Sequence, residues 1–193
     1  FGNRVLEPVW TAEHVERIDV VADETLALEG RAGYYDSTGA LVDMLQSHLL
    51  LVTALVTMEA PARLDATELH DLLATTLRST HVWRDDPCAC SRRARYTAGR
   101  AGGRDVVAYT DEEGVDPSRG TETLAEVVLE VRNQRWAGVP VRLRSGKALG
   151  EDSMRVTVTF RPPPHVPEAF AGGAPPSRLT MGIAPGRVAL DLA

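Results

Sequence analysis

Two acids and a histidine lie in or next to one apolar segment of the chain. Burying a charged side chain is costly, so charged residues in such a segment are candidates for a function. Glu24 precedes a glycine-rich segment, and Asp43 and His48 stand inside the apolar segment that follows. Imidazole changes charge near neutral pH, so His48 can serve as a general base, while carboxylates accept hydrogen bonds from hydroxyl groups. These residue types favour a site that binds a polar substrate and removes a proton from it.

Structural roles are the alternative for each of these residues. A lone histidine in a helix is more commonly a satisfied core residue, and carboxylates beside glycine turns commonly cap helices or face water. The spacing of Asp43 and His48 places them about 140° apart around an α-helix. They need not pair directly, although both could face one pocket.

Lys147 is the only lysine among the 21 lysines and arginines of the chain. A compact ammonium group with three donors is not interchangeable with the planar guanidinium of arginine, so Lys147 is a candidate for substrate binding, with chance survival as the alternative. Arg142 and Arg144 alternate with apolar residues. That pattern predicts a solvated strand face.

The first half of the chain predicts one strand followed by two helices. Residues 17–22 have strand composition, and residues 40–58 are good helix formers that are apolar nearly all round. Such a helix is expected to be central and buried. Asp65 and Glu68 form a capping box that opens a second, amphipathic helix with leucines at helical spacing.

The second half alternates apolar and polar residues, which is typical of strands. We expect strands over residues 124–131, 139–143 and 154–160, and two more between 178 and 192 around a turn at 184–186. Residues 91–105, rich in arginine and glycine, are expected to form a solvated loop. The sequence therefore predicts an α+β fold: a large, mainly antiparallel sheet with helices packed on one face.

Composition excludes several classes of partner. The 193 residues carry a formal charge of −6, and the one dense basic cluster, at residues 92–95, is expected to be solvated, so nucleic acid is not expected as a partner. Cys88 and Cys90 are too close together for an easy disulfide and too few for zinc, which favours a reducing cytoplasm and no metal site. The apolar run 49–56 is shorter than the roughly 20 residues of a membrane span, so no membrane partner is expected.

Several segments, in order along the chain, resemble the C-terminal, substrate-binding domain of glucose-6-phosphate dehydrogenase of the bacterial type. The resemblance covers residues 7 to about 192 and is carried by these segments: 7–10 (Glu-Pro-Val-Trp), 24–36, 43–48 (Asp-Met-Leu-Gln-Ser-His), 111–117, 121–123 (Thr-Glu-Thr), 133–140, 144–147 (Arg-Ser-Gly-Lys) and 160–165.

The resemblance implies a role for each candidate residue. His48 is similar to the family's general base, which takes the proton of the C1 hydroxyl of D-glucose 6-phosphate while hydride passes from C1 to NADP. The product is 6-phosphogluconolactone, in the first step of the pentose phosphate pathway. Glu24 and Asp43 resemble acceptors for sugar hydroxyls, and Lys147 resembles a donor to the sugar. The resemblance also implies a homodimer or homotetramer formed through the sheet.

Two family segments have no counterpart in this sequence: the glycine-rich nucleotide-binding turn and the Arg-Ile-Asp-His-Tyr segment that binds the substrate phosphate. We therefore interpret residues 1–193 as an incomplete C-terminal domain, truncated at both ends, without cofactor-binding residues of its own. NADP would be bound mainly by an absent N-terminal Rossmann domain. The isolated chain is accordingly expected to be inactive.

Three positions depart from the family pattern. Ser47 stands where asparagine is common, and Ala184 lacks a polar amide found in some members. Asp152 replaces a second basic residue, and its charge is expected to repel a phosphorylated sugar and weaken its binding. Asp152 and Ala184 support an alternative function, a non-catalytic paralogue or assembly module of the same fold.

Overall fold

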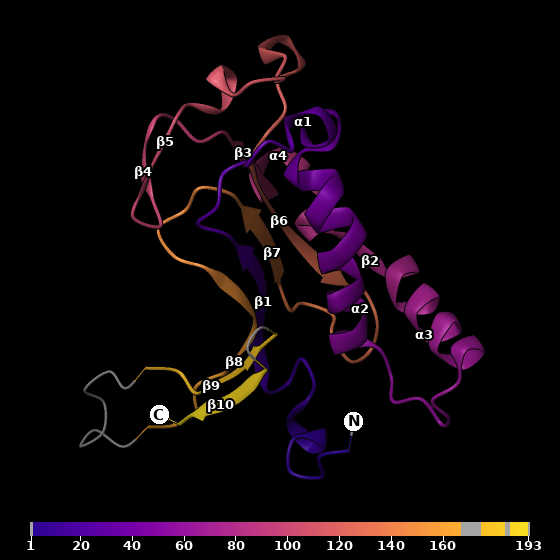
Figure 1. Ribbon diagram of the computed structural model, residues 1–193. Helices are drawn as coiled ribbons and strands as arrows, with labels where there is room; N and C mark the ends of the chain where they lie inside the picture. The colour runs from indigo at the N-terminus through magenta and orange to yellow at the C-terminus, as the bar shows by residue number, and fades with distance from the viewer. Residues whose placement is uncertain (1, 167–174, 184–185, 193) are drawn as a thin grey trace.

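The computed structural model describes residues 2–166, 175–183 and 186–192. Its centre is an eight-stranded sheet of order β10-β9-β8-β1-β7-β6-β2, with β3 also paired to β6 (Figure 1). The strands are β1 (Val15–Asp23), β2 (Thr80–Val82), β3 (Ser91–Ala94), β6 (Leu124–Val131), β7 (Val141–Gly146), β8 (Ser153–Phe160), β9 (Arg178–Gly182) and β10 (Arg187–Asp191). A separate hairpin joins β4 (Gly99–Ala101) to β5 (Arg104–Val106).

One pair in this sheet is parallel. β1 runs parallel to β7, with Ile18 opposite Val141 and Asp23 opposite Gly146, and all other pairs are antiparallel. The predicted α+β class, with its mainly antiparallel sheet, is confirmed. Because parallel neighbours end at the same edge of a sheet, the residues that follow β1 and β7 are brought side by side.

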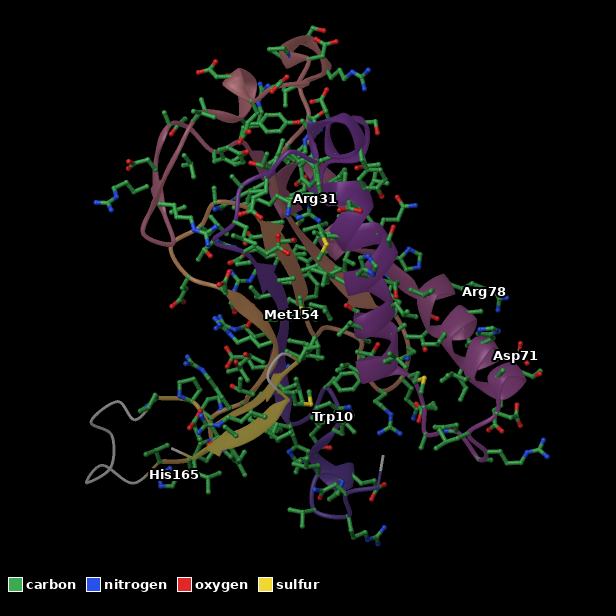
Figure 2. All side chains as sticks on the ribbon, viewed as in Figure 1. Trp10, Arg31, Asp71, Arg78, Met154 and His165 are labelled. Carbon is green, nitrogen blue, oxygen red and sulfur yellow. The ribbon has the colours of Figure 1, made fainter. Side chains whose placement is uncertain are left out.

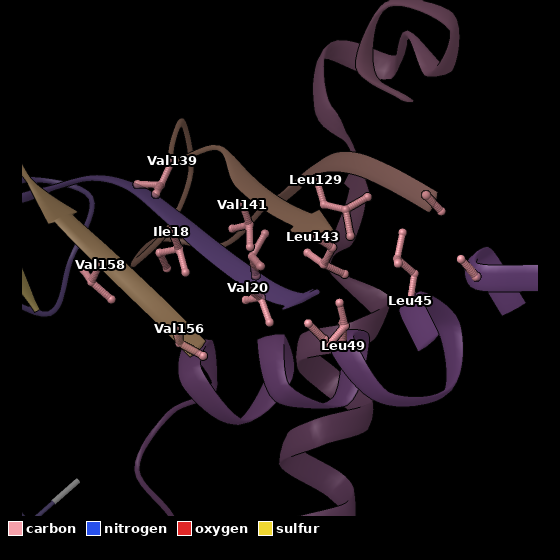
Figure 3. Close-up of a cluster of buried hydrophobic side chains, with 14 of the residues drawn as sticks. Ile18, Val20, Leu45, Leu49, Leu129, Val139, Val141, Leu143, Val156 and Val158 are labelled. Carbon is pink, nitrogen blue, oxygen red and sulfur yellow. The ribbon is translucent and has the colours of Figure 1, made fainter. Parts of the chain in front are cut away.

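The helices gather on one face of the sheet (Figure 1). They are α1 (Ala32–Ala40), the π-helical segment η2 (Leu41–Leu49), α2 (Leu50–Thr57), α3 (Ala66–Arg78) and the short α4 (Pro87–Cys90), with 3₁₀ turns η1 (Glu7–Val9), η3 (Trp83–Asp85), η4 (Tyr109–Asp111) and η5 (Pro117–Arg119). Leu45 and Leu49 point from the helix toward Leu143 and Val20 of the sheet (Figure 3). Burial of these apolar side chains supplies the main stabilisation of the two layers.

The main helix differs from its prediction in length and in burial. Helical structure starts at Ala32, with a break at Gly39, and does not begin at residue 40 as expected. Its outer side is exposed, with Leu41 at 42% and Leu51 at 45%, so the helix is not covered all round. The predicted buried, central helix is therefore wrong for this outer side.

The arginine-rich segment also differs from its prediction. Residues 91–105 contain β3, β4 and β5 where a loop was expected. The side chains of β3 are exposed, as predicted for a solvated segment, but the backbone of β3 pairs with residues 124–127 of β6. Hydrogen bonding to a distant strand fixed this element, and local composition carried no signal of it.

Two tryptophans anchor the C-terminal end of α2. The indole of Trp136 donates to Thr57 O at 2.7 Å, and that of Trp10 donates to Val56 O at 2.9 Å. Figure 2 places Trp10 at the end of the main helix opposite Arg31, which precedes α1. These donors satisfy carbonyl groups that a helix end leaves without partners.

By length and composition, the helical span Ala32–Thr57, 26 residues long, could cross a membrane. The apolar run of residues 49–56 noted in the sequence is shorter than this helix, because that run begins only after His48. The inner side of this helix packs in the domain core through Tyr35, Leu45 and Leu49. One such helix is weak support for a membrane span, since core helices of globular domains meet the same criterion.

The sheet face opposite the helices is charged. Asp19 pairs with Arg142 at 2.7 Å and with Arg17 at 3.2 Å, and Arg144 pairs with Asp23 at 3.0 Å. The alternation of the strands puts these residues opposite Val20 and Leu143, which face the helices. Arg142 and Arg144 are half-buried and held in ion pairs, whereas the sequence predicted side chains in contact with solvent.

Two glycines of the helical span provide a matched pair of variants. A Cβ at Gly39 (φ 68°) would lie 2.6 Å from Glu122 Oε1, whereas a Cβ at Gly33 would meet nothing within 4 Å. We expect Gly39→Ala to lower the free energy of unfolding by about 1–3 kcal/mol, since its backbone region is essentially restricted to glycine. Gly33→Ala should raise it by up to about 1 kcal/mol. Urea unfolding of both variants tests this, and equal effects of the two would contradict it.

Candidate functional site

Glu24 and Lys147 form an ion pair at the shared edge of β1 and β7. Lys147 Nζ lies 2.5 Å from Glu24 Oε2, with side-chain exposures of 11% for the lysine and 36% for the glutamate. Glu24 directly follows β1 and Lys147 directly follows β7. The parallel register therefore brings together two of the four residues predicted from the sequence.

Backbone hydrogen bonds hold the turn that carries Lys147. Glu24 N donates to Gly146 O at 2.9 Å, Lys147 N to Thr123 O at 2.9 Å, and Leu149 N to Glu24 O at 3.0 Å. Ala148 has a φ of 54°, a left-handed conformation that is unusual for alanine. Such local strain persists only where neighbouring bonds impose it, and here three segments of the chain do so.

Tyr35 lies beside this ion pair. Lys147 Nζ lies 5.4 Å from the centre of the Tyr35 ring, close enough for a cation–π contact. Burial raises the pKa of Tyr35 well above its ordinary range, and the negative charges of Glu122, Asp43 and Glu24 raise it further. The charges of Asp43 and Glu24 thus both disfavour the phenolate form of this buried residue.

The segment that carries Asp43 and His48 is a π-helix, which the sequence did not predict. Leu50 N donates to Leu45 O, and Ser47 Oγ donates to Val42 O at 2.9 Å, each across five positions. Hydrogen bonds of a π-helix join residues i and i+5, so Asp43 and His48 follow one another along one side of the helix. The angle of about 140° expected for an α-helix is therefore wrong for this pair.

His48 is exposed, in contrast to the buried position expected for it. Its neighbours Gln46 and Ser47 are exposed as well, while Leu45 and Leu49 face the core. In the part of the chain that the structure describes, no hydrogen bond or ion pair joins His48 to Glu24, Asp43 or Lys147. The histidine thus stands on the accessible side of the helix, where a substrate could reach it.

Tyr34 is a contact of Asp43 that sequence reasoning missed. Its hydroxyl donates to Asp43 Oδ1 at 3.1 Å, and the ring is 63% exposed. Hydrogen bonding to Asp43 raises the pKa of Tyr34 above its ordinary value, and the negative charge of Asp43 adds to this. Tyr34 and Asp43 are nine positions apart, with the break at Gly39 between them. Because the helix is not regular across this break, helical spacing would not have predicted the contact.

Glu122 and Thr123 connect the helix to the lysine turn. Glu122 Oε1 accepts from Leu41 N at 2.9 Å, at the start of the π-helical segment, and Arg93 lies 3.7 Å from Glu122 Oε2. Thr123 O accepts from Lys147 N. These two residues belong to the Thr-Glu-Thr segment noted in the sequence, which was given no role there. They position the elements that carry Asp43, His48 and Lys147.

Asp152 and Ala184, the two departures given weight in the sequence, have different outcomes. The carboxylate of Asp152 accepts hydrogen bonds from Thr25, next to Glu24. Ala184 lies outside the described residues. The effect of Asp152 on substrate affinity stays a prediction, and its contact with Thr25 gives it a structural role that the sequence did not suggest.

A metal ion and a dinucleotide each need a particular set of binding residues. Within the described ranges, no three His, Cys, Asp or Glu side chains are grouped so that they could hold a metal ion. The connection from β1 to α1 carries Gly30 together with Glu24 and Glu29, and Gly33 follows inside α1. It lacks the G-x-G-x-x-G spacing, and its acids would repel a pyrophosphate, so it does not fit a dinucleotide.

Comparison with known families decides the assignment. The model for "Glucose-6-phosphate dehydrogenase, C-terminal domain" matches residues 1–192. The chain belongs to this family. The glucose-6-phosphate dehydrogenase resemblance noted in the sequence is therefore confirmed.

Individual relatives agree with the family. The chain is 40% identical over 173 residues to glucose-6-phosphate 1-dehydrogenase 2 of Mycobacterium tuberculosis strain H37Rv, covering 86% of this chain and 32% of the relative. It is 40% identical over 187 residues to the glucose-6-phosphate 1-dehydrogenase of Gluconobacter oxydans, covering 96% and 37%. The chain thus spans about a third of the length of these curated relatives.

Two solved structures share the fold. The glucose-6-phosphate 1-dehydrogenase of Mycobacterium avium matches with a TM-score of 0.85 and 32% identity, over 100% of this chain and 41% of that one. A glucose-6-phosphate dehydrogenase in complex with its substrate glucose-6-phosphate matches with a TM-score of 0.80 and 32% identity, over 95% and 36%.

The contact between Tyr34 and Asp43 predicts a titration. In Asp43→Asn, the pKa of Tyr34 should fall back toward its ordinary value of about 10, because the charge that disfavours the phenolate is gone. The ¹³Cζ shift of Tyr34, followed by NMR against pH, measures it. Tyr96, whose pKa is raised by burial and by Glu112, is the control and should not move. An unchanged Tyr34 would contradict the contact.

Proposed function

We propose that this chain is the substrate-binding domain of an NADP-dependent glucose-6-phosphate dehydrogenase. Family membership supports this, together with the clustering of Glu24, Lys147 and Tyr35 near Asp43. The substrate would be D-glucose 6-phosphate, oxidised at C1 to 6-phosphogluconolactone, as the first step of the pentose phosphate pathway. The single observation that carries the proposal is the Glu24–Lys147 pair at the end of the parallel strands.

Glu24, Asp43 and Lys147 would orient the sugar. A sugar hydroxyl both donates and accepts hydrogen bonds, so it can satisfy a carboxylate and an ammonium group in turn. Glu24 is half-buried and Lys147 largely buried, which limits the directions from which a ring could approach. Fixing one pose of the ring is a means of lowering the barrier of the chemical step.

His48 would be the general base. It would take the proton of the C1 hydroxyl, and the electrons of that O–H bond would form the C1=O bond. The hydrogen on C1 would leave as hydride for NADP, with both electrons of the C1–H bond. The exposed position of His48 on the helix leaves it open to such a substrate. An imidazole needs little adjustment of its pKa for this task near neutral pH.

NADP, the hydride acceptor in this proposal, would be bound mainly by a separate N-terminal Rossmann domain. The connection from β1 to α1 lacks the glycine spacing of a dinucleotide site, and the outer side of the main helix leaves Leu41, Val42, Leu51 and Leu55 exposed. An apolar helix side next to His48 suits an interface with such a domain. On this proposal, the 193-residue chain alone does not reduce NADP with glucose 6-phosphate.

Assembly and location complete the proposal. Cytoplasmic location is proposed from the two free cysteines, Cys88 and Cys90. A homodimer or homotetramer would form through the charged sheet face around Asp19 and Arg142. The alternative, a non-catalytic assembly module, loses one of its two supports, because Asp152 has a structural partner in Thr25.

Replacing His48 tests the catalytic assignment. In a full-length dehydrogenase that carries this domain, His48→Gln should lower kcat/KM for glucose 6-phosphate by about 10²–10⁴-fold, the usual contribution of a general base. His70→Gln, an exposed histidine on α3, is the matched control and should leave the rate unchanged. Equal rates for the wild type and His48→Gln would rule out His48 as the base, and a silent, folded wild type would favour the non-catalytic alternative.

Light scattering tests the proposed assembly. We expect the molar mass of a dimer or tetramer for the wild type. Arg155→Glu should shift it toward the monomer, because it reverses a charge of β8 on the sheet face that carries Asp19. Arg78→Glu, on the exposed side of α3, is the control for charge reversal elsewhere. A monomeric wild type would contradict an assembly through the sheet.

A further inference from the structure

Asp152 uses both of its carboxylate oxygens on one residue far away in the sequence. Oδ1 accepts from Thr25 N at 2.6 Å, and Oδ2 accepts from Thr25 Oγ1 at 3.2 Å. Asp152 stands just before β8, and Thr25 comes directly after Glu24. The carboxylate therefore tethers the chain next to Glu24, one of the residues of the candidate site.

The tether acts on a single peptide group, the one that joins Glu24 to Thr25. Its carbonyl, Glu24 O, accepts from Leu149 N at 3.0 Å. Its N–H, on Thr25, donates to Asp152. Because a peptide group is planar, holding it from both sides fixes the ψ angle of Glu24. The direction of the Glu24 side chain relative to Lys147 is thereby set.

A close packing contact supports the same geometry. A Cβ at Gly102 would lie 2.9 Å from Thr25 Cβ, so the turn between β4 and β5 packs closely against the side chain of Thr25. Arg104 at the start of β5 also pairs with Glu29 at 3.0 Å. The segment that follows Glu24 is thus confined by the hairpin as well as by Asp152.

We propose that Asp152 is a positioning residue that orients Glu24 toward Lys147 and the sugar. This inference rests on the proposed function and replaces the expectation that Asp152 acts chiefly by repelling the substrate. The two ideas differ in what they require of residue 152. Repulsion depends on its negative charge, whereas the tether depends on an oxygen that accepts from Thr25 N.

Three variants of a full-length dehydrogenase that carries this domain separate these requirements. Asp152→Asn keeps an acceptor oxygen and loses the charge, while Asp152→Ala loses both. Glu151→Gln removes a charge from the neighbouring exposed position and leaves the tether intact. NMR titration with glucose 6-phosphate gives the affinity of each, and amide hydrogen exchange at Thr25 reports on the tether without any ligand.

We expect Asp152→Ala to weaken glucose 6-phosphate binding by about tenfold. Amide exchange at Thr25 should become at least about tenfold faster, because the hydrogen bond from Thr25 N to a charged group is lost. Asp152→Asn and Glu151→Gln should stay within about twofold of the wild type in both measurements.

Other outcomes overturn the inference in distinguishable ways. Unchanged Thr25 exchange in Asp152→Ala would show that the tether does not exist. Tighter binding in Asp152→Asn, Asp152→Ala and Glu151→Gln alike would show that charge repulsion dominates. If the folded wild type does not bind glucose 6-phosphate, the proposed function fails and the role in substrate binding fails with it, while Thr25 exchange still reports whether Asp152 holds the loop.

Discussion

The hydrogen bonds between β1 and β7 set the positions of most other features of the site. They run in parallel register from Ile18–Val141 to Asp23–Gly146, in a sheet whose remaining pairs are antiparallel. An antiparallel pairing would send the two following segments to opposite edges. Because the pairing is parallel, Glu24 and Lys147 emerge together, and the backbone bonds from Gly146, Leu149 and Thr123 can join their segments. A shift of the register would separate the acid from the ammonium group.

The helix layer adds the second half of the site through a change of helical geometry. Glu122 accepts from Leu41 N where the π-helical segment begins, and Trp136 and Trp10 donate to the carbonyls at the end of α2. Contacts at both ends thus hold the wider turns between them, a geometry that is rare in proteins and frequently found at functional sites. This geometry puts Asp43 and His48 on one side of the helix and leaves the buried side to Leu45 and Leu49.

Much of the sheet and the family could be predicted from the sequence, because strand alternation and ordered motifs are local signals. β6 was predicted with its observed bounds, and Glu24 and Lys147 were identified before their contact was known. The π-helix could not be predicted, since its composition matches that of an α-helix and the difference lies in backbone hydrogen bonds. Glu122 and Asp152 act on partners 81 and 127 residues away, and no spacing rule reaches that far. The roles assigned to His48 and Asp43 are not tested by the fold and stay predictions.

The ion pair between Glu24 and Lys147 also bears on selectivity. A ligand that enters between them must break a contact already made, so its own contacts compete with an internal one. A simple anion could satisfy Lys147 but would leave Glu24, half-buried, beside another negative charge. A polyhydroxylated ring can satisfy both partners at once, because each hydroxyl is donor and acceptor. On the proposed function, the ion pair would thus favour a sugar over free phosphate, although both are present wherever sugar phosphates are made.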